Sequence, residues 1–447
     1  MPQAMDGRSL GADLRLLRPP LSEFTFMGMM LGSGRDVLHF MRATRSLRSF
    51  SYVARRMASH IADIVRYGRG MSLANGNALA GRLLLSLRKR GVSMQFASRV
   101  SRLLHDADGV HGALVETASG TREVHARRAV VLACGGGSHD LHLQATYAHV
   151  KGGGDHFSLA CAGSSGDGFQ LANEAGACLD FELPQNAAWV PVSRVPRRDG
   201  TFGIFPHFID RGKPGVIAVD HRGERFTNEA ANYHDFVKAM VAAAGSRRPV
   251  RAHLICDHPT LRRYGLGAVR PAPLPFAQHL RSGYLYRAST MEELARRMDV
   301  DPQTLQKTMD RCRLDAASGK DSAFGKGDTE HNRHMGDALI APNPCFGPVS
   351  TPPFYAVELA VGDLGTFAGI RTDGAGRALN KEGRVIKGLY AIGNDMASVF
   401  AGSYPSAGAT LGAALTFGYI AGTDLAREPI SPENADEGTG ASPRQCQ

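Results

Sequence analysis

Gly388-Leu-Tyr-Ala-Ile-Gly-Asn394 is followed ten residues later by Tyr404-Pro-Ser-Ala-Gly-Ala-Thr-Leu-Gly412, and an apolar run then extends from Ala413 to Ala421. This pattern predicts a strand that ends in Gly-Asn, a loop of small residues and a helix that opens on Leu-Gly. The free N–H groups and the positive dipole end of such a helix attract anionic or polar groups, and glycine permits close approach. We therefore expect a seat for a polar ring at this turn.

The composition is that of an ordinary globular protein. The chain has 447 residues, of which 43% are hydrophobic and 21% charged, enough for two or three packed domains. It contains no apolar run of about eighteen residues, and its first residues form neither a basic nor an apolar leader, so a cytoplasmic location is expected. The seven cysteines are scattered and never form Cys-x-x-Cys, which predicts reduced, mostly buried thiols, no disulfide framework and no metal site.

Much of the formal net charge of +10 lies between Arg35 and Arg102. Two interpretations of this basic, helical region stay open. One is a solvated helix face, the commoner case for a run of charges, and the other is peripheral contact with an anionic membrane surface. No motif of interleaved aromatic and basic residues is present, so nucleic-acid binding is not expected.

Apolar periodicity predicts a mixed α/β organisation. Helical and strand patterns alternate in the first part of the chain, as in the interior of a dinucleotide-type domain, and the pattern changes near Pro191. A small-residue turn at Ser165–Gly168 is expected to cap a helix that ends at Gly176. The other predicted elements are helices at 36–67 and 77–90, strands at 92–96, 128–134 and 215–220, a hairpin at 99–106 and 110–117, and a helical pair at 290–317.

A series of motifs resembles the flavoprotein family of fumarate reductase and succinate dehydrogenase, in that family's order and from about residue 70 to 425. These motifs are Arg128–Gly136, Gly166–Gly168, Val219–Glu229, Pro342–Pro344, Pro353–Val357, Gly388–Asn394 and Leu411–Gly412. Within the family, Asn232–Phe236, Gly362–Thr366 and Tyr404–Gly408 most resemble the 3-ketosteroid dehydrogenase branch. The resemblance implies an FAD-dependent oxidoreductase.

The implied fold is α/β, with a Rossmann-like FAD-binding domain and an inserted α+β substrate domain that caps it. The expected segments are 1–190 and 362–427 for the two parts of the FAD-binding domain, 191–361 for the substrate domain, and 428–447 for a disordered polar tail.

The resemblance also implies an N-terminal module that holds the FAD pyrophosphate with a strand, a Gly-x-Gly-x-x-Gly turn and a helix. No such motif occurs in this sequence, since Gly32-Ser-Gly34 and Gly68-Arg-Gly70 lack a third glycine in register. By comparison with relatives, about one hundred residues of this first βαβ unit are missing. Three hypotheses follow: an active enzyme that takes the module from a separate chain, an inactive remnant, or a steroid- or lipid-binding module. For the chain alone we expect impaired FAD binding.

The implied cofactor site surrounds the turn described first. A reduced flavin carries negative charge at one edge of its ring, which donor N–H groups at a helix start stabilise. By resemblance, the residues that line the cofactor are Gly135, Gly136, Asp167, Gly393, Asn394, Thr410, Leu411 and Gly412.

The implied reaction is dehydrogenation next to a ketone of a lipophilic substrate, such as a 3-ketosteroid. A base removes the proton α to the carbonyl, and a hydride passes from the β carbon to flavin N5. By resemblance, the Tyr404 hydroxyl and the Gly408 N–H donate hydrogen bonds to the carbonyl oxygen as it gains charge, and Tyr233 is the base. Relatives have a partner tyrosine beside that base, which falls close to where this sequence begins. Ser406 stands where relatives carry glycine, and either tunes the substrate pocket or caps its own loop.

Two points bear on this assignment. Reduction of a dicarboxylate such as fumarate, the rival chemistry in the family, needs arginine forks and histidines. The segments that would carry them, Gly365–Thr366 and Ser403–Gly412, contain no arginine and no histidine. His207, His221 and His234 are interpreted as surface or loop residues. The steroid, the ring position oxidised and the electron acceptor stay undefined.

Overall fold

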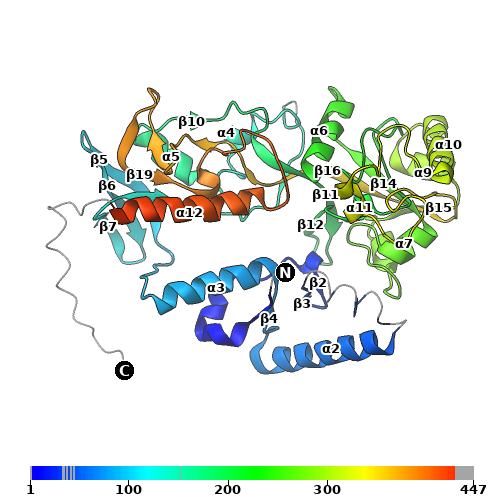
Figure 1. Cartoon of the computed structure of the whole chain (residues 1–447), viewed down its shortest axis with the longest axis horizontal. Coiled ribbons are helices and arrows are strands. Elements are labelled where there is room, and N and C mark those ends of the chain that lie inside the picture. Colours follow the sequence, from blue (N-terminus) through cyan, green and yellow to red (C-terminus); the bar gives the residue numbers. More distant parts are fainter. Residues whose placement is uncertain are drawn as a thin grey trace. The chain divides into compact units, whose positions relative to one another are not determined.

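The computed structural model describes residues 3–32, 36, 39, 40, 43, 46–151 and 153–427, so the predicted tail lies outside the described residues. The chain divides into two compact units. Unit 1 comprises Met1–Gln95, Val195–Phe205 and Leu261–Ser282, and unit 2 comprises Phe96–Arg194, Pro206–Thr260 and Gly283–Gln447. The prediction of mixed α/β structure is confirmed (Figure 1).

Unit 1 is built from short strands and helices. Its small core contains Leu10, Leu14 and Leu73 and is closed by α3 (Asn75–Lys89). The long helix α2 begins after the Ser46 N-cap, whose side chain accepts a hydrogen bond from Ser49 N, and it ends at left-handed Gly68. The other elements are β1 (Met5–Asp6) paired with β4 (Ser72–Leu73), η1 (Gly7–Leu16), η2 (Ser22–Phe24), β2 (Thr25–Phe26) paired with β3 (Met29–Met30), α2 (Leu47–Tyr67) and α8 (Ala277–Arg281).

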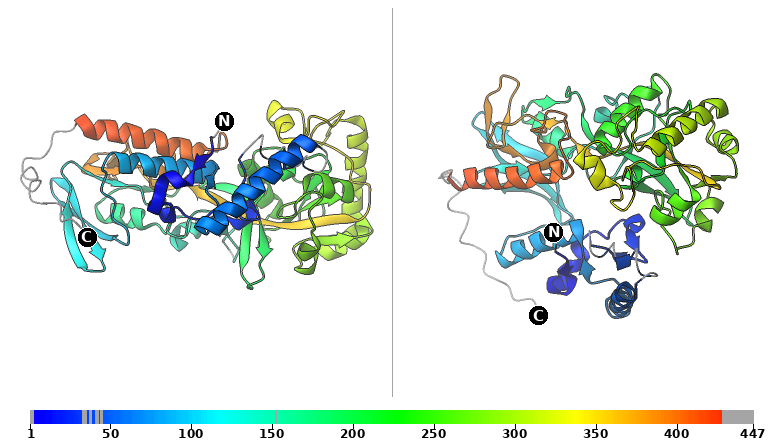
Figure 2. Two further views of the ribbon diagram at one scale, coloured as in Figure 1. Left: turned by 90° about the horizontal axis from the view of Figure 1, so that it is seen from below. Right: turned by 45° about the vertical axis from the view of Figure 1, so that its right-hand side comes forward.

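The largest sheet of unit 2 is centred on β16 (Phe354–Thr366), which pairs antiparallel with β11 and β14. Two amphipathic helices, α9 and α10, cover part of it with a continuous apolar cluster, and they lie side by side in yellow-green (Figures 1 and 2). The predicted helical pair is therefore confirmed. The elements are β9 (Phe157–Ser158), β11 (Ala187–Pro196), β13 (Val216–Val219), β14 (Ala252–Asp257), β15 (Tyr286–Ala288), α6 (Tyr233–Ala244), α9 (Met291–Met298), α10 (Pro302–Ser318) and α11 (Glu330–Met335).

Three smaller sheets and a long helix belong to the described part of unit 2. The predicted hairpin is present and is joined by a third strand, in a second sheet β8 runs parallel to β19, and in a third β10 pairs antiparallel with β17. The helix that opens after the small-residue loop is α12 (Ala409–Arg427). The further elements are β5 (Arg99–Asp106), β6 (Gly109–Thr117), β7 (Gly120–His125), β8 (Val130–Leu132), α4 (Leu141–Gln144), α5 (Asp167–Glu174), β10 (Leu179–Asp180), β17 (Gly369–Ile370), β18 (Arg377–Leu379), β19 (Val385–Ala391) and η4 (Gly393–Asp395).

Three local predictions are wrong. Residues 92–96 form no strand, because they bury no face: Val92 is 43% exposed and Phe96 57%. The strand predicted at 128–134 shrinks to β8, whose central Val131 is 37% exposed. The thiols are less buried than expected, since Cys134 and Cys161 are both exposed.

Candidate active site

Two tyrosines that lie far apart in the sequence meet in unit 2. Tyr233 is the first residue of α6, behind the N-cap Asn232, whose side chain accepts a hydrogen bond from Asp235 N. Tyr404 lies in the loop before α12. The two hydroxyl groups are hydrogen-bonded to each other, the ring centroids are 5.1 Å apart, and both side chains are buried. The structure thus brings together the predicted base and the predicted carbonyl donor.

Burial, followed by the hydrogen bond with Tyr404, raises the pKa of Tyr233 above its ordinary value. The buried guanidinium of Arg211 acts in the opposite direction. Backbone carbonyl groups fix this cation: Nε donates to His207 O at 2.7 Å, and Nη1 donates to Glu229 O at 2.8 Å. The phenol of Tyr233 therefore lies near a fixed cation, which favours its ionised form, although the net shift of its pKa is upward.

His234 is a site residue that the sequence interpretation missed. Only 1% of it is exposed, and its ring stacks on that of Tyr404 with centroids 5.7 Å apart and an angle of 19°. Its Nδ1 accepts a hydrogen bond from Trp189 N at 3.2 Å, which places the proton on Nε2. Burial lowers the pKa of His234 to about 4, so the ring is neutral near pH 7. Within the described residues, Nε2 has no hydrogen-bond partner and is a free donor beside the tyrosine pair.

The prediction of a surface or loop position is therefore wrong for His234, which is buried in a helix, whereas His207 lies in a loop as expected but is not at the surface. His207 is fully buried and contacts Ser193 Oγ at 2.9 Å and Asp210 Oδ2 at 2.6 Å. The sequence did carry one signal for His234: it directly follows Tyr233 in the first turn of a capped helix, where side chains are held firmly.

Helix α12 follows the small-residue loop (Figure 1), and a seat for a polar ring is expected at its start. Ala409 N donates to Ser406 O and Gly412 N to Gly408 O, but Thr410 N and Leu411 N donate to no group in the described part of the chain. A Cβ atom on Gly408 or Gly412 would meet no atom within 4 Å. Free donors at a helix start with open space around them fit the anionic edge of a flavin ring.

The glycine turn Gly135–Gly136 is packed tightly against other segments of the chain. A Cβ atom on Gly136 would stand 2.2 Å from Thr366 Oγ1 and 2.7 Å from Asn394 O, so only glycine fits between these segments. The carboxylate of Asp395 fastens the same turn, because it accepts hydrogen bonds from Gly136 N at 3.0 Å and from Cys134 N. Asp395, which the sequence interpretation missed, thereby holds Asn394 beside the Gly135–Gly136 turn.

Two further predicted residues lie at the surface of unit 2. Asp167 begins α5, is exposed and accepts a hydrogen bond from Ser165 Oγ at 2.9 Å. The hydrogen bond from Gly166 N to Gly136 O, 3.1 Å, holds this turn beside the glycine turn. Ser406 is exposed, and its carbonyl oxygen receives the bond from Ala409 N. The roles assigned to these residues by resemblance stay predictions.

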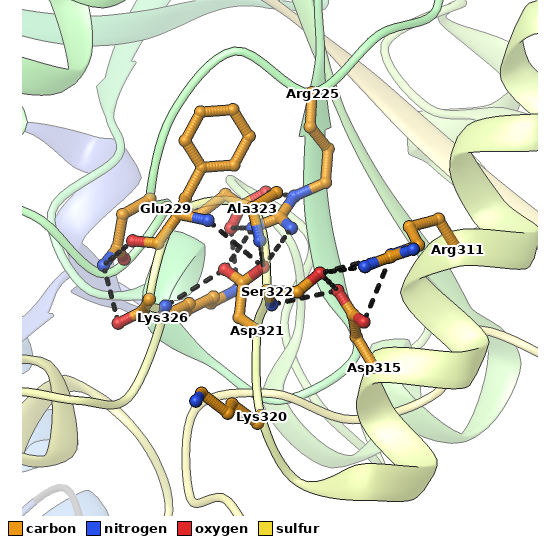
Figure 3. Close-up of polar contacts among 12 residues, drawn as sticks. Arg225, Glu229, Arg311, Asp315, Lys320, Asp321, Ser322, Ala323 and Lys326 are labelled. Carbon is orange, nitrogen blue, oxygen red and sulfur yellow. Dashed lines mark hydrogen bonds and ion pairs between the residues drawn. The ribbon is translucent and has the colours of Figure 1, made fainter.

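The motif Arg225-Phe-x-Asn-Glu229 builds a buried ion cluster (Figure 3). Arg225 Nη2 contacts Glu229 Oε2 at 2.9 Å, Arg225 Nη1 contacts Asp321 Oδ1 at 2.8 Å, and Lys326 Nζ lies 3.3 Å from Glu229. Burial alone would raise the pKa of Glu229, but Arg225 and Lys326 hold it below its ordinary value. Glu229 O also accepts from Arg211, so the cluster fixes the segment that leads into Tyr233.

Comparisons with known proteins agree with this geometry. Residues 15–411 match the family described as FAD binding domain. The chain is 38% identical over 435 residues to the 4-oxocyclohex-2-ene-1-carboxylate 5-dehydrogenase of Sinomonas cyclohexanicum, covering 97% of this chain and 74% of that protein. It is 31% identical to the 3-oxosteroid 1-dehydrogenase of Mycobacterium tuberculosis, covering 95% and 75%. The crystal structure of a 3-ketosteroid delta1-dehydrogenase from Sterolibacterium denitrificans, in complex with 1,4-androstadiene-3,17-dione, matches with a TM-score of 0.84 and 32% identity, over 95% of this chain and 76% of that one.

Proposed function

We propose that this chain introduces a C=C bond next to the ketone of a cyclic substrate. The chain belongs to the fumarate reductase and succinate dehydrogenase family of FAD-dependent oxidoreductases, and to its 3-ketosteroid-dehydrogenase-like branch. The observation that carries the proposal is the buried hydroxyl pair of Tyr233 and Tyr404. Proton removal next to a carbonyl group requires a hydrogen-bond donor at the carbonyl oxygen and a base near the α carbon, and two neighbouring hydroxyl groups can supply both to one ketone.

In this proposal Tyr404 donates its hydroxyl proton in a hydrogen bond to the ketone oxygen. As the proton on the neighbouring carbon leaves, negative charge grows on that oxygen, and the donor stabilises it more strongly than it stabilises the neutral ketone. The N–H of Gly408 is the second predicted donor, and Gly408 has φ of 88°, a conformation that glycine adopts without strain.

Tyr233 removes the proton. Because burial raises its pKa, the phenol is protonated at neutral pH, and its conversion to a base depends on the charges around it. The cation of Arg211 lowers the pKa of Tyr233 and supports its role as the base, while burial and Tyr404 act more strongly in the opposite direction.

FAD is the cofactor of this family, and the open start of α12 fits its ring. Thr410, Leu411 and Gly412 are the residues that would hold the anionic edge of the ring, while Gly393 and Asn394 would line it. Bound FAD supplies the acceptor for the hydride that leaves the β carbon.

The relatives favour a ring ketone as the substrate. One is named for a 4-oxocyclohexene carboxylate and the other for 3-oxosteroids, so both names describe a ketone on a carbon ring. The absence of arginine and histidine from residues 362–366 and 403–412 speaks against dicarboxylate reduction by these segments.

The test is product formation. Purified protein supplied with FAD and an artificial electron acceptor is incubated with 4-androstene-3,17-dione or with 4-oxocyclohexanecarboxylate, and products are identified by mass spectrometry. The proposal requires loss of two hydrogens from one of these ketones and at least a hundredfold slower turnover in Tyr404→Phe, since one transition-state donor contributes about 3 kcal/mol. Turnover of neither ketone by FAD-loaded protein, or unchanged turnover in the variant, would refute it.

A further inference from the structure

A cavity of about 210 Å³ lies in unit 2, at the opposite end of α6 from Tyr233. Its walls come from the ends of α6 and α9, from the loop after α6, and from the strands β14 and β16. Neither member of the tyrosine pair lines it, so it is distinct from the candidate active site. Half of the lining residues are basic, namely His221, Arg247, Arg248, Arg251 and His253.

The main sheet builds one wall of the cavity. In the antiparallel ladders, His253 of β14 lies opposite Glu358 of β16 on one side and Val219 of β13 on the other. Residues opposite each other, and residues two apart along one strand, point to the same face of a sheet. Arg251 therefore shares the face of His253 and Glu358, and all three line the cavity. The alternation in the sequence thus directs two basic side chains of neighbouring positions to one site.

Two of the three arginines are paired with carboxylates. Arg251 Nε lies 3.1 Å from Glu358 Oε1, and Arg251 Nη2 donates to Asp155. Arg247 lies 3.8 Å from Asp299, and both of these side chains are more than half exposed, so this pair is weak. The charge of Arg251 is therefore compensated within the chain, whereas that of Arg247 is compensated only in part.

Arg248 has no carboxylate partner among the described residues. Its Nη1 donates to Gly245 O at 2.9 Å and to Arg247 O at 2.7 Å, and its Nη2 donates to Ala148 O at 2.7 Å. These carbonyl groups hold the guanidinium in place but supply no counter-charge. The C-terminal ends of α6 and α9 add partial negative charge here, which Arg247 and two arginines in the last turn of α9 offset. Arg248 is thus a fixed cation beside a cavity.

Three buried nitrogen atoms of the lining residues have no hydrogen-bond partner within the described ranges: Arg248 Nε, His221 Nδ1 and His253 Nδ1. Arginine Nε always carries a proton. Burial lowers the pKa of His253 to about 4, so its ring is neutral near pH 7 and still has one N–H to donate. Buried donors without an acceptor are costly and rare. Water would satisfy such donors, whereas an anion would satisfy them and also balance the charge of Arg248.

We propose that this cavity binds a small phosphate-type oxyanion, either free or as the phosphoryl group of a small molecule. The donors come from three segments around the cavity: the turn after β13, the loop after α6, and β14. A tetrahedral oxyanion offers acceptor oxygens in several directions and takes charge-assisted hydrogen bonds from arginine, whereas the two oxygens of a carboxylate lie in one plane. The volume is below the roughly 300–1,000 Å³ of pockets for larger organic ligands, which agrees with a small anion. This site is independent of the proposed dehydrogenase reaction.

Calorimetric titration of the purified full chain with inorganic phosphate tests the site. At constant ionic strength and without other oxyanions, wild type should bind phosphate saturably at one site per chain. Arg248→Gln should weaken binding roughly tenfold or more, because a charge-assisted hydrogen bond and the counter-charge are lost, and Arg248→Lys should be intermediate. Arg313→Gln removes an exposed arginine of α10 and, as the control, should bind like wild type. Absence of saturable binding in wild type, or equal affinity in Arg248→Gln, overturns the proposal.

Unfolding in urea gives a second readout that also shows whether the variants fold. Phosphate should raise the urea midpoint of wild type and of Arg313→Gln but not that of Arg248→Gln. Two further ligands separate the possible occupants. Glycerol 3-phosphate that binds more tightly than inorganic phosphate identifies a phosphorylated small molecule as the ligand, and weaker binding identifies the free ion. Acetate that binds as tightly as phosphate would show that the cavity takes any anion and would overturn the phosphate assignment.

Discussion

Removing the hydroxyl group of Tyr404 should destabilise the protein through Tyr233. Both hydroxyl groups are buried and bonded to each other, so Tyr404→Phe leaves the Tyr233 hydroxyl without its partner. An unpaired buried hydroxyl costs about 1–3 kcal/mol. Tyr233→Phe should cost a similar amount for the same reason, whereas the double variant removes both groups together and should be no less stable than either single variant. The free energies of unfolding in urea should therefore show a coupling of about 1–2 kcal/mol.

Tyr147→Phe is the matched control for this cycle. Its hydroxyl is also buried but has no hydrogen-bond partner within the described residues, so its removal should leave the free energy of unfolding unchanged or raise it. Strictly additive effects of Tyr233→Phe and Tyr404→Phe would refute the hydroxyl pair as described. A loss in Tyr147→Phe as large as that in Tyr404→Phe would show that deletion of any buried phenol hydroxyl is costly in this protein, and the paired hydrogen bond would lose its support.

Three other predictions follow from the same site. Arg211→Gln removes the cation that favours ionised Tyr233, so the pKa of the base rises and the pH–rate profile should move to higher pH, with a smaller movement in Arg211→Lys. His234→Phe removes the Nε2 donor and also the Nδ1 acceptor of Trp189 N, so the variant should lose about 1–3 kcal/mol of stability while kcat/KM for the ketone falls about tenfold. His234→Gln should recover part of the loss in kcat/KM. Glu229→Gln unbalances the buried ion cluster and should lower the free energy of unfolding by about 3–5 kcal/mol at pH 7. Because the pKa of Glu229 is depressed in the folded protein, its contribution to stability is present above pH ~4. The difference in stability from wild type should therefore shrink as the pH falls below that value.

Each of these predictions has a distinct contradicting outcome. If the pH–rate profile of Arg211→Gln matches that of wild type, Arg211 does not affect the pKa of the catalytic base. If wild type and His234→Phe have equal kcat/KM, the Nε2 atom of His234 does not interact with the substrate. A Glu229→Gln variant that unfolds at the wild-type urea concentration would show that the cluster contributes nothing to stability, with exposed Glu382→Gln as the control for removal of a surface carboxylate.

Much of the architecture could be predicted from the sequence because its signals are local. The helical pair at 290–317 carries a Thr290 cap and apolar periodicity, and the hairpin at 99–117 carries an Asp-Gly turn, so both elements appear as expected. The segment at 92–96 has the alternation of a strand but buries no face, and only tertiary packing decides whether such a segment pairs. The sequence also did not show that the apolar side of α2 is exposed, since an amphipathic pattern does not say which side of a helix faces the core.

The candidate site could be predicted only in part. From the order of the motifs, Tyr233, Tyr404 and the start of α12 were predicted to belong to one site. The structure places the two tyrosines in contact. His234 and Asp395 escaped because their importance depends on burial and on partners distant in sequence: Trp189 N for His234, and Gly136 N for Asp395. The expectation of a missing N-terminal βαβ unit and of impaired FAD binding stays a prediction.

The most direct test of the proposed dehydrogenase activity is the visible absorbance of the FAD-loaded protein when a ring ketone is added without oxygen. Hydride transfer from the substrate should bleach the oxidised-flavin band, and the bleaching should be at least a hundredfold slower in Tyr404→Phe. A band that persists in the wild-type protein with both 4-androstene-3,17-dione and 4-oxocyclohexanecarboxylate, or one that bleaches equally fast in the variant, would contradict the proposed role of the tyrosine pair.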